Sequence, residues 1–135
     1  MKKPTLTIGI PAYNEEHSIG VLLQSLFSQK MTNFSLIKII VVLDASTDHT
    51  YEVLRRIKKT HPKLQIVLRT KRSGKAQALN VLYSKVNTDY LLTIDADLAF
   101  ESTTALDKMI QKLECDKKLN LTSTRHAPRM PKSWM

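Results

Sequence analysis

The chain has 135 residues, and its 42% hydrophobic and 24% charged residues are typical of one globular domain rather than of a disordered chain. Its 21 Lys and Arg residues exceed its 12 Asp and Glu residues, which gives a formal net charge of +9 at pH 7. The longest apolar run, Ile39–Leu43, is too short for a transmembrane helix, and the single cysteine, Cys115, excludes an internal disulfide and a cysteine-rich zinc site.

Strand and helix patterns alternate along the first half of the chain. The β-branched apolar run Leu6–Ile10 predicts a strand, and apolar residues at helical spacing over residues 19–27 predict the helix that follows it. The near-continuous apolar run Ile37–Leu43 predicts a strand that is buried on both faces. Apolar residues within Val53–Ile57 then mark a second helix.

The alternation continues through the second half of the chain. Leu64–Leu68 and Tyr90–Ile94 are predicted strands, residues 79–86 and 106–113 are predicted helices, and Leu119–Thr124 is a candidate fifth strand. Strands that alternate with helices of this length predict right-handed βαβ units. We therefore expect an α/β fold, a Rossmann-like three-layer αβα arrangement with a mostly parallel sheet.

Ser and Thr residues, which favour helix N-caps, precede the last three predicted helices. The expected caps are Ser46 or Thr47 for the second helix, Ser73 for the third and Ser102 for the fourth. Asp48 is expected in the first turn of the second helix, where a negative charge is favourable.

Polar clusters follow each of the first four predicted strands. The carboxyl ends of parallel strands meet at one edge of the sheet, where such folds bind ligands, so we expect these clusters to form one site. The clusters are residues 11–16, 44–48, 71–75 and 95–97. Helix capping explains some of their Ser and Asp residues, but it does not explain an Asp at the end of two apolar strands.

Asp95 and Asp97 predict a metal site. In an extended chain, residues i and i+2 point the same way, so both carboxylates would lie on one side of the sheet edge. Carboxylate oxygens suit hard cations such as Mg²⁺ and Mn²⁺, which keep open positions for substrate phosphates. The alternative is a turn in which both Asp side chains accept hydrogen bonds from local backbone N–H groups.

Asp44 and Tyr13 each allow two interpretations. Asp44 ends the most apolar strand, and a buried carboxylate needs a partner because an isolated charge in an apolar setting is costly. The partner could be the N-terminus of the following helix or an N–H group of a ligand, such as the imide of a pyrimidine base. Tyr13 could stack on a base or cover the end of the sheet.

Two common nucleotide-binding motifs are excluded. Glu15 and Glu16 lie where a dinucleotide-binding fold has glycines, and their charges would repel a pyrophosphate. The Gly74-Lys75 pair resembles the end of a P-loop, but Arg69 replaces the first glycine of that motif and Ala76 replaces its Ser or Thr.

The positive charge is concentrated between Val53 and Thr88, where no acidic residue occurs. Such a basic surface attracts phosphates, anionic lipid or nucleic acid, or else forms a solvated helix face. Tyr83 is the only Phe, Trp or Tyr in this segment, so no stacking platform for nucleic acid is expected.

Four segments together resemble the inverting family 2 glycosyltransferases of the GT-A fold, in the family's order and at its usual spacing. They are Ile10–Glu16 (IPAYNEE), Val41–Thr50 (VVLDASTDHT), Gly74–Asn80 (GKAQALN) and Asp95–Asp97 (DAD). The resemblance covers about residues 5–115.

The resemblance implies a role for each matched residue. The implied donor-binding residues are Pro11, Ala12, Tyr13, Glu15, Asp44, Lys75 and Asp95. Among them, Asp44 matches the carboxylate that binds the base, which is uracil in the commonest donors. Asp95 and Asp97 match the DxD motif, which holds Mn²⁺ or Mg²⁺ on the donor diphosphate, and such a metal neutralises the leaving group as a Lewis acid.

The chain departs from the family pattern in two ways. Leu43 and Ala45 replace an Asp and a Gly that are often found in the second segment. The general base, a carboxylate in the acceptor half of the family's domain, has no match after Asp97. We therefore expect residues 1–118 to form the nucleotide-sugar-binding half, residues 119–135 to begin the acceptor half or form a tail, and the chain alone to transfer no sugar.

The predicted function is metal-assisted transfer of a sugar, with inversion, from a nucleotide-diphosphate sugar to an acceptor. A UDP-sugar is the expected donor, and a glycan or lipid-linked glycan of the cell envelope is the candidate acceptor. The expected location is the cytoplasm, with the inner face of the membrane as a candidate surface. No nucleic-acid partner is expected.

Three other functions compete with this prediction. A receiver domain would use the Glu15-Glu16 pair with Asp44 or Asp95 as phosphoacceptor, but it needs a Lys at the end of its fifth strand, where this chain has Thr122–Arg125. A haloacid dehalogenase-type phosphatase would use residues 91–97, but that motif should open its domain. A non-catalytic nucleotide-binding module on a basic surface is the third alternative.

Overall fold

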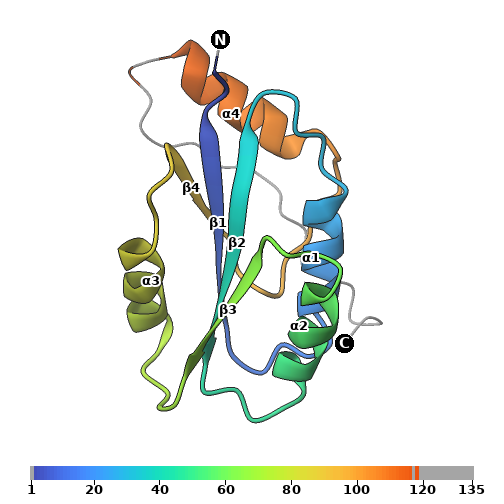
Figure 1. Ribbon diagram of the computed structural model, residues 1–135, viewed down its shortest axis with the longest axis vertical. Helices are drawn as coiled ribbons and strands as arrows, with labels where there is room; N and C mark the ends of the chain where they lie inside the picture. The colour runs from blue at the N-terminus through green and yellow to red at the C-terminus, as the bar shows by residue number, and fades with distance from the viewer. Residues whose placement is uncertain (1, 117, 119–135) are drawn as a thin grey trace.

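The computed structural model describes residues 2–116 and residue 118, which form alternating strands and helices (Figure 1). The strands are β1 (Thr5–Ala12), β2 (Ser35–Asp44), β3 (Leu64–Arg69) and β4 (Tyr90–Thr93). The helices are α1 (Ile19–Phe27), α2 (Thr50–Lys58), α3 (Lys75–Ser84) and α4 (Ala105–Cys115). The predicted alternation is confirmed, and the candidate fifth strand lies outside the described residues.

The four strands form one parallel sheet in the order β3-β2-β1-β4. The central strand β1 pairs with β2 along its whole length, from Thr5 opposite Ser35 to Ala12 opposite Leu43. β2 and β3 add to one side of β1, and β4 returns to its other side. The order therefore reverses between β1 and β4, and the carboxyl end of such a switch point is where parallel sheets bind ligands.

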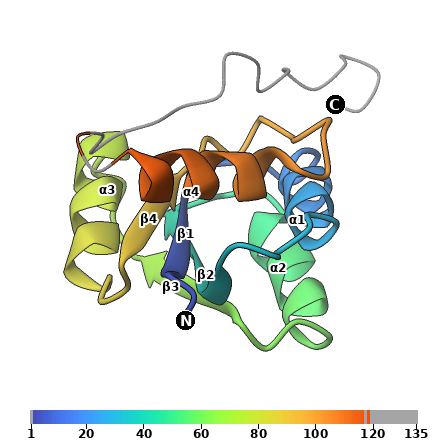
Figure 2. The same cartoon turned by 90° about the horizontal axis from the view of Figure 1, so that it is seen from above.

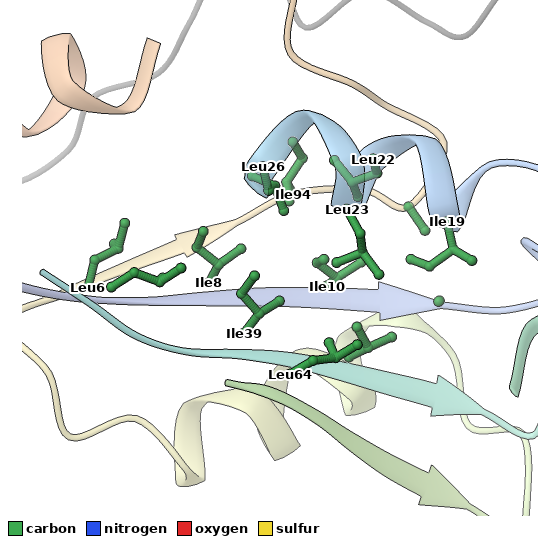
Figure 3. Packing of buried hydrophobic residues seen from close by; sticks show 14 of the residues in the cluster. Leu6, Ile8, Ile10, Ile19, Leu22, Leu23, Leu26, Ile39, Leu64 and Ile94 are labelled. Carbon is green, nitrogen blue, oxygen red and sulfur yellow. The ribbon is translucent and has the colours of Figure 1, made fainter. Parts of the chain in front are cut away.

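Helices cover both faces of the sheet, and Figure 2 shows α3 on one side with α1 and α2 on the other. On the α1 face, Ile8, Ile10 and Ile39 belong to one apolar cluster with the buried leucines of α1 (Figure 3). α4 adds Leu106 and Ile110 to this same cluster. On the other face, α3 packs Ala78 and Leu82 against Ile40 and Val42. The predicted three-layer architecture is confirmed.

Gly9 allows α3 to lie close against the sheet. A Cβ atom placed on Gly9 would lie 2.9 Å from Cδ1 of Leu82, which is fully buried. Real Cβ contacts essentially never come this close, so the missing side chain is a packing requirement. It lets the last turn of α3, which contains Leu82, lie close against β1.

Buried polar groups fix α4 to the loop between α1 and β2. The Asp107 carboxylate accepts hydrogen bonds of 2.9 Å from the backbone N–H groups of Thr32 and Asn33. Oε1 of Gln29 accepts the N–H of Leu106 at 3.2 Å. Among the described helices, none combines the length and the hydropathy that a membrane span requires.

The predicted N-cap of α2 is wrong. The helix follows His49, so Ser46 and Thr47 lie outside it, and their hydroxyl groups contact the β1–α1 loop instead. Asp48 also precedes the helix rather than lying in its first turn. Its Oδ1 accepts the N–H of Thr50 at 3.0 Å, so this carboxylate satisfies the helix start.

The predicted N-caps of α3 and α4 are also displaced. α3 follows Gly74 and not Ser73, because the N–H and hydroxyl of Ser73 donate to Asp44. Gly74 has a φ of 90°, a backbone conformation that favours glycine. α4 follows Thr104, and the Ser102 hydroxyl accepts the N–H of that residue at 3.2 Å instead of capping the helix.

Candidate functional site

A cavity of about 340 Å³ opens at the carboxyl edge of the sheet, beside the ends of β1 and β2, the loop after β4 and the start of α3. The polar clusters that follow all the described strands contribute to its wall. Every site residue predicted from the sequence lines it, namely Pro11, Ala12, Tyr13, Glu15, Asp44, Lys75, Asp95 and Asp97. The structure therefore brings the predicted residues together at the switch point of the sheet.

Asp44 is buried at the end of β2, on the face that α3 covers. Its carboxylate accepts hydrogen bonds from the N–H of Gly74 at 2.7 Å, and from the N–H and hydroxyl of Ser73 at 3.0 and 3.2 Å. The Nε atom of Arg69 lies 3.7 Å from Oδ1. The partner is thus the start of α3 and not that of the following helix, α2, which lies on the opposite face.

These donors keep Asp44 ionised. Burial by itself raises the pKa of the Asp44 carboxyl, but the N–H groups of Ser73 and Gly74, the Ser73 hydroxyl and the Arg69 guanidinium outweigh burial. The net result is a pKa below the ordinary value of 3.8. The cavity therefore has a fixed negative charge beneath the β3–α3 loop.

Asp95 and Asp97 lie in a turn and not in an extended strand. β4 ends at Thr93, and the N–H of Leu98 donates to the carbonyl oxygen of Asp95 at 3.2 Å. The extended geometry assumed from the sequence is wrong, but both carboxylates are exposed and line the cavity. Within the described part of the chain, neither carboxylate accepts a local backbone N–H, so the turn alone does not explain them.

Lys75 is the partner of Asp95, since its Nζ atom lies 2.5 Å from Oδ1. Among the described residues, no group of three or more His, Cys, Asp or Glu side chains could hold a metal ion. Asp95 and Asp97 therefore offer a pair of carboxylates. Magnesium-like cations bind through one or two carboxylates and complete their octahedron with phosphate and water, so this donor set fits a divalent cation that binds with a phosphate ligand.

Arg72 lines the cavity, although the sequence did not identify it as a site residue. Its guanidinium carbon lies 3.5 Å from the centroid of the Tyr13 ring, which is a cation–π contact. The ring of Tyr13 is therefore covered by a cation on one face. The available signal was the basic polar cluster after β3, but nothing in the sequence distinguishes Arg72 from Lys71.

Asn14 connects the β1–α1 loop to the β2–α2 loop, a role that the sequence also did not reveal. Its backbone is left-handed, with a φ of 50°, a conformation that Asn tolerates better than most residues. Oδ1 accepts the N–H groups of Thr47 and Asp48 at 2.7 and 3.3 Å, and the N–H of Asn14 donates to Ser46 Oγ at 3.0 Å. The polar residues of the second cluster therefore hold the two loops together.

Glu15 and Glu16 have different surroundings. Glu15 lines the cavity, and its Oε2 accepts the Ser18 hydroxyl at 2.6 Å. Glu16 does not line the cavity, and its Oε2 accepts the N–H of His49 at 3.2 Å. The acidic pair that a receiver domain would need is not assembled at this site.

Comparison with known proteins identifies the family. The profile of the family described as "Glycosyl transferase family 2" matches residues 7–135. The chain belongs to glycosyl transferase family 2. The poly-beta-1,6-N-acetyl-D-glucosamine synthase of Staphylococcus aureus (strain COL) is 31% identical to it over 114 residues, which are 84% of this chain and 26% of the relative. The teichoic acid poly(glycerol phosphate) polymerase of Staphylococcus epidermidis is 33% identical over 93 residues, or 68% of this chain and 12% of that protein.

This family 2 chain thus spans about a quarter or less of the length of the curated relatives it matches. Among solved structures, the mannosyltransferase PcManGT from Pyrobaculum calidifontis in complex with GDP-Man and Mn²⁺ has a TM-score of 0.76 and 32% identity, over 84% of this chain and 33% of that one. S. aureus TarS 1-349 in complex with UDP has a TM-score of 0.71 and 24% identity, over 84% of this chain and 32% of the TarS chain.

These similarities confirm the expected GT-A type of fold, and the TarS likeness supports the fold alone. The PcManGT complex shows that a divalent metal occurs in this family. Family membership also excludes the receiver and phosphatase interpretations of the sequence.

Proposed function

We propose that this chain is the donor-binding part of a glycosyltransferase, which transfers a sugar with inversion from a nucleotide-diphosphate sugar to a glycan or lipid-linked glycan. One observation carries the proposal. The family-matched residues of all the polar clusters meet in one cavity of about 340 Å³, at the point where the strand order reverses. A UDP-sugar is the proposed donor.

Tyr13 and Asp44 form the nucleoside side of the proposed site. An aromatic ring can stack on a base, and an ionised carboxylate can accept the imide N–H of uracil. Asp44 already accepts hydrogen bonds from Ser73 and Gly74, so we assign it two roles, which are to fix the β3–α3 loop and to receive the base. Pro11 and Ala12 form the adjoining wall.

Lys75, Asp95 and Asp97 form the diphosphate side of the proposed site. Asp95 and Asp97 would hold Mn²⁺ or Mg²⁺, and the Mn²⁺ in the PcManGT complex favours manganese. When bound, such a metal supplies Lewis-acid stabilisation of the departing diphosphate. Lys75 would donate to a phosphate oxygen as a mobile point charge.

The acceptor side of the reaction is proposed to lie outside the described residues. Inverting transfer needs a base within about 3 Å of the acceptor hydroxyl. Of the described carboxylates after Asp97, Asp107 binds Thr32, Glu114 binds Tyr90, and none lines the cavity. We therefore expect this chain alone to bind the donor and to transfer no sugar.

The names of two relatives support the proposed class of acceptor, and the charge distribution supports the proposed location. The S. aureus and S. epidermidis relatives are named for making a poly-N-acetylglucosamine and a teichoic acid polymer. We propose a cell-envelope acceptor and a cytoplasmic site of action at the inner face of the membrane, to which the basic segment between Val53 and Thr88 would be attracted.

Calorimetric titration with UDP and GDP, with and without Mn²⁺ or Mg²⁺, tests donor binding. We expect UDP to bind more tightly than GDP and the metal to strengthen binding. UMP is the matched control, since it has the same base and lacks the second phosphate. Absence of heat at millimolar UDP and GDP, with a chain that unfolds cooperatively on heating, would contradict the proposed function.

A further inference from the structure

The contact between Lys75 and Asp95 joins the two sides of the switch point. Lys75 begins α3, whereas Asp95 lies in the loop after β4, and Nζ lies 2.5 Å from Oδ1. The two side chains are 60% and 50% exposed, so water competes for both charges. An exposed ion pair of this kind is weak and exchanges partners easily.

This ammonium takes a carboxylate oxygen that a metal ion would use. Asp95 and Asp97 together have two negative charges, and Lys75 neutralises one of them. A divalent cation that enters alone therefore meets a paired carboxylate and a like charge beside it. Arg72 adds a second positive charge to the cavity wall. Among the described residues, no third metal-binding side chain completes the site.

A nucleoside diphosphate changes this balance. Its phosphate oxygens offer the ammonium a more negative partner than Asp95, and a lysine side chain is long and flexible enough to exchange one for the other. Once Lys75 has moved, both carboxylates are free to accept a cation that also binds the phosphates.

We propose that Lys75 couples metal binding to diphosphate binding. It pairs with Asp95 in the free site and moves to the diphosphate when the nucleotide enters. A nucleoside monophosphate has less charge with which to draw Lys75 away, so the exchange favours diphosphates over monophosphates. The diphosphate step rests on the proposed function, whereas the free-state pairing rests on the Lys75–Asp95 contact itself.

Lys75→Met tests the exchange, because it removes the ammonium and keeps a long unbranched side chain. Lys71→Met is the matched control, since it makes the same change in net charge at an exposed position of the loop that precedes α3. Electron paramagnetic resonance of free Mn²⁺ gives the affinity for the metal alone. Calorimetry gives the affinity for UDP alone, and thermal unfolding checks that each variant is folded.

We expect Lys75→Met to bind Mn²⁺ alone roughly threefold to fivefold more tightly than Lys71→Met, the size of one exposed ion pair. The same variant should bind UDP alone more weakly. A merely structural lysine would not change the two affinities in opposite directions. Adding Asp95→Asn to Lys75→Met should abolish the gain for Mn²⁺, because the freed carboxylate is then missing.

Equal or weaker Mn²⁺ binding by Lys75→Met, relative to Lys71→Met, would overturn the exchange. If Mn²⁺ strengthens UDP binding by the wild-type chain but Lys75→Met does not bind Mn²⁺ more tightly than Lys71→Met, the exchange fails and the proposed function stands. If the gain is present but no nucleotide binds the wild-type chain, the proposed function fails and the free-state pairing of Lys75 stands.

Discussion

The Asp44 carboxylate accepts a 2.7 Å hydrogen bond from the backbone N–H of Gly74, the residue that precedes α3. Asp44 ends β2, so this bond fixes the β3–α3 loop to a strand of the sheet core. The loop places Arg72 over Tyr13 and starts the helix at Lys75. The positions of both cations in the cavity therefore depend on one buried carboxylate.

Asp44→Ala should lower the free energy of unfolding by about 1–3 kcal/mol, because it leaves the N–H groups of Ser73 and Gly74 without their acceptor. Asp44→Asn keeps an acceptor oxygen and should cost less than the alanine variant. Urea denaturation followed by circular dichroism measures both values. Equal stability of Asp44→Ala and the wild type would show that water replaces the carboxylate without loss.

The stability of the chain should decrease in acid through Asp44. Burial raises the pKa of this carboxyl, but its N–H, hydroxyl and guanidinium partners lower it below 3.8 in the folded state. A carboxyl whose pKa is lower in the folded state than in the unfolded state stabilises the protein at any pH above its unfolded-state pKa. That contribution is lost as the pH falls through the folded-state pKa. We expect the unfolding free energy to fall below about pH 3.8, and to fall less in Asp44→Asn.

Asn14 should tolerate glycine better than alanine. Asn14→Gly loses the side-chain hydrogen bonds to the β2–α2 loop, at a cost of about 1 kcal/mol, but keeps the left-handed backbone. Asn14→Ala loses the same bonds and puts a Cβ atom at a φ of 50°, which adds about 1 kcal/mol. Denaturant unfolding ranks the two variants, and a more stable alanine variant would contradict this account.

Gly9 and Gly20 should respond in opposite ways to the same substitution. Gly9→Ala places a Cβ atom 2.9 Å from the buried Leu82 side chain and should destabilise the fold by about 1–3 kcal/mol. Gly20→Ala places its Cβ atom 3.8 Å from Val53, an ordinary contact, and should stabilise α1 by about 0.5–1 kcal/mol. Midpoints of thermal unfolding compare the two, and a stable Gly9→Ala would show that α3 moves freely on the sheet.

Asp97 and Asp44 should contribute separately to nucleotide binding. Asp97→Ala is expected to abolish the strengthening of UDP binding by Mn²⁺ and to leave the metal-free affinity for UDP unchanged. Asp44→Ala should weaken UDP binding by about 1–3 kcal/mol with or without the metal, since it removes a charge-assisted acceptor. Calorimetry of both variants with and without Mn²⁺ measures the metal-free affinity for UDP and its strengthening by Mn²⁺. If both variants lose the same one of these two quantities, the roles of Asp44 and Asp97 are wrongly assigned.

The fold was predictable because the apolar periodicities are local and strong. The runs Leu6–Ile10 and Ile37–Leu43 lie within β1 and β2, and the helical spacing over residues 19–27 coincides with α1. The meeting of the polar clusters was also predictable, since it follows from the parallel arrangement of the strands. Knowledge of the strand order was not needed for either prediction.

The contacts inside the site depend on chain segments that are distant in sequence, and they were not predictable. Ser73 is a reasonable helix cap by residue type, but its N–H and hydroxyl are taken by Asp44. The contact of Arg72 with Tyr13 needs the position of the β3–α3 loop relative to β1. Helix and capping propensities depend on residues that are close in the sequence, whereas these contacts depend on the packing of segments that are distant in the sequence.

The strand order β3-β2-β1-β4 also bears on how the chain folds during synthesis. As the chain leaves the ribosome, β2 can pair with β1 and then β3 with β2, because the partner of each of these strands has already been synthesised. One edge of β1 stays open until Tyr90 reaches Leu6, and an open edge can pair with the wrong strand. The loop with Asp95 and Asp97 follows β4, the last of the described strands, so a nascent chain acquires the part of the cavity wall with Tyr13, Asp44 and Lys75 before the part with Asp95 and Asp97.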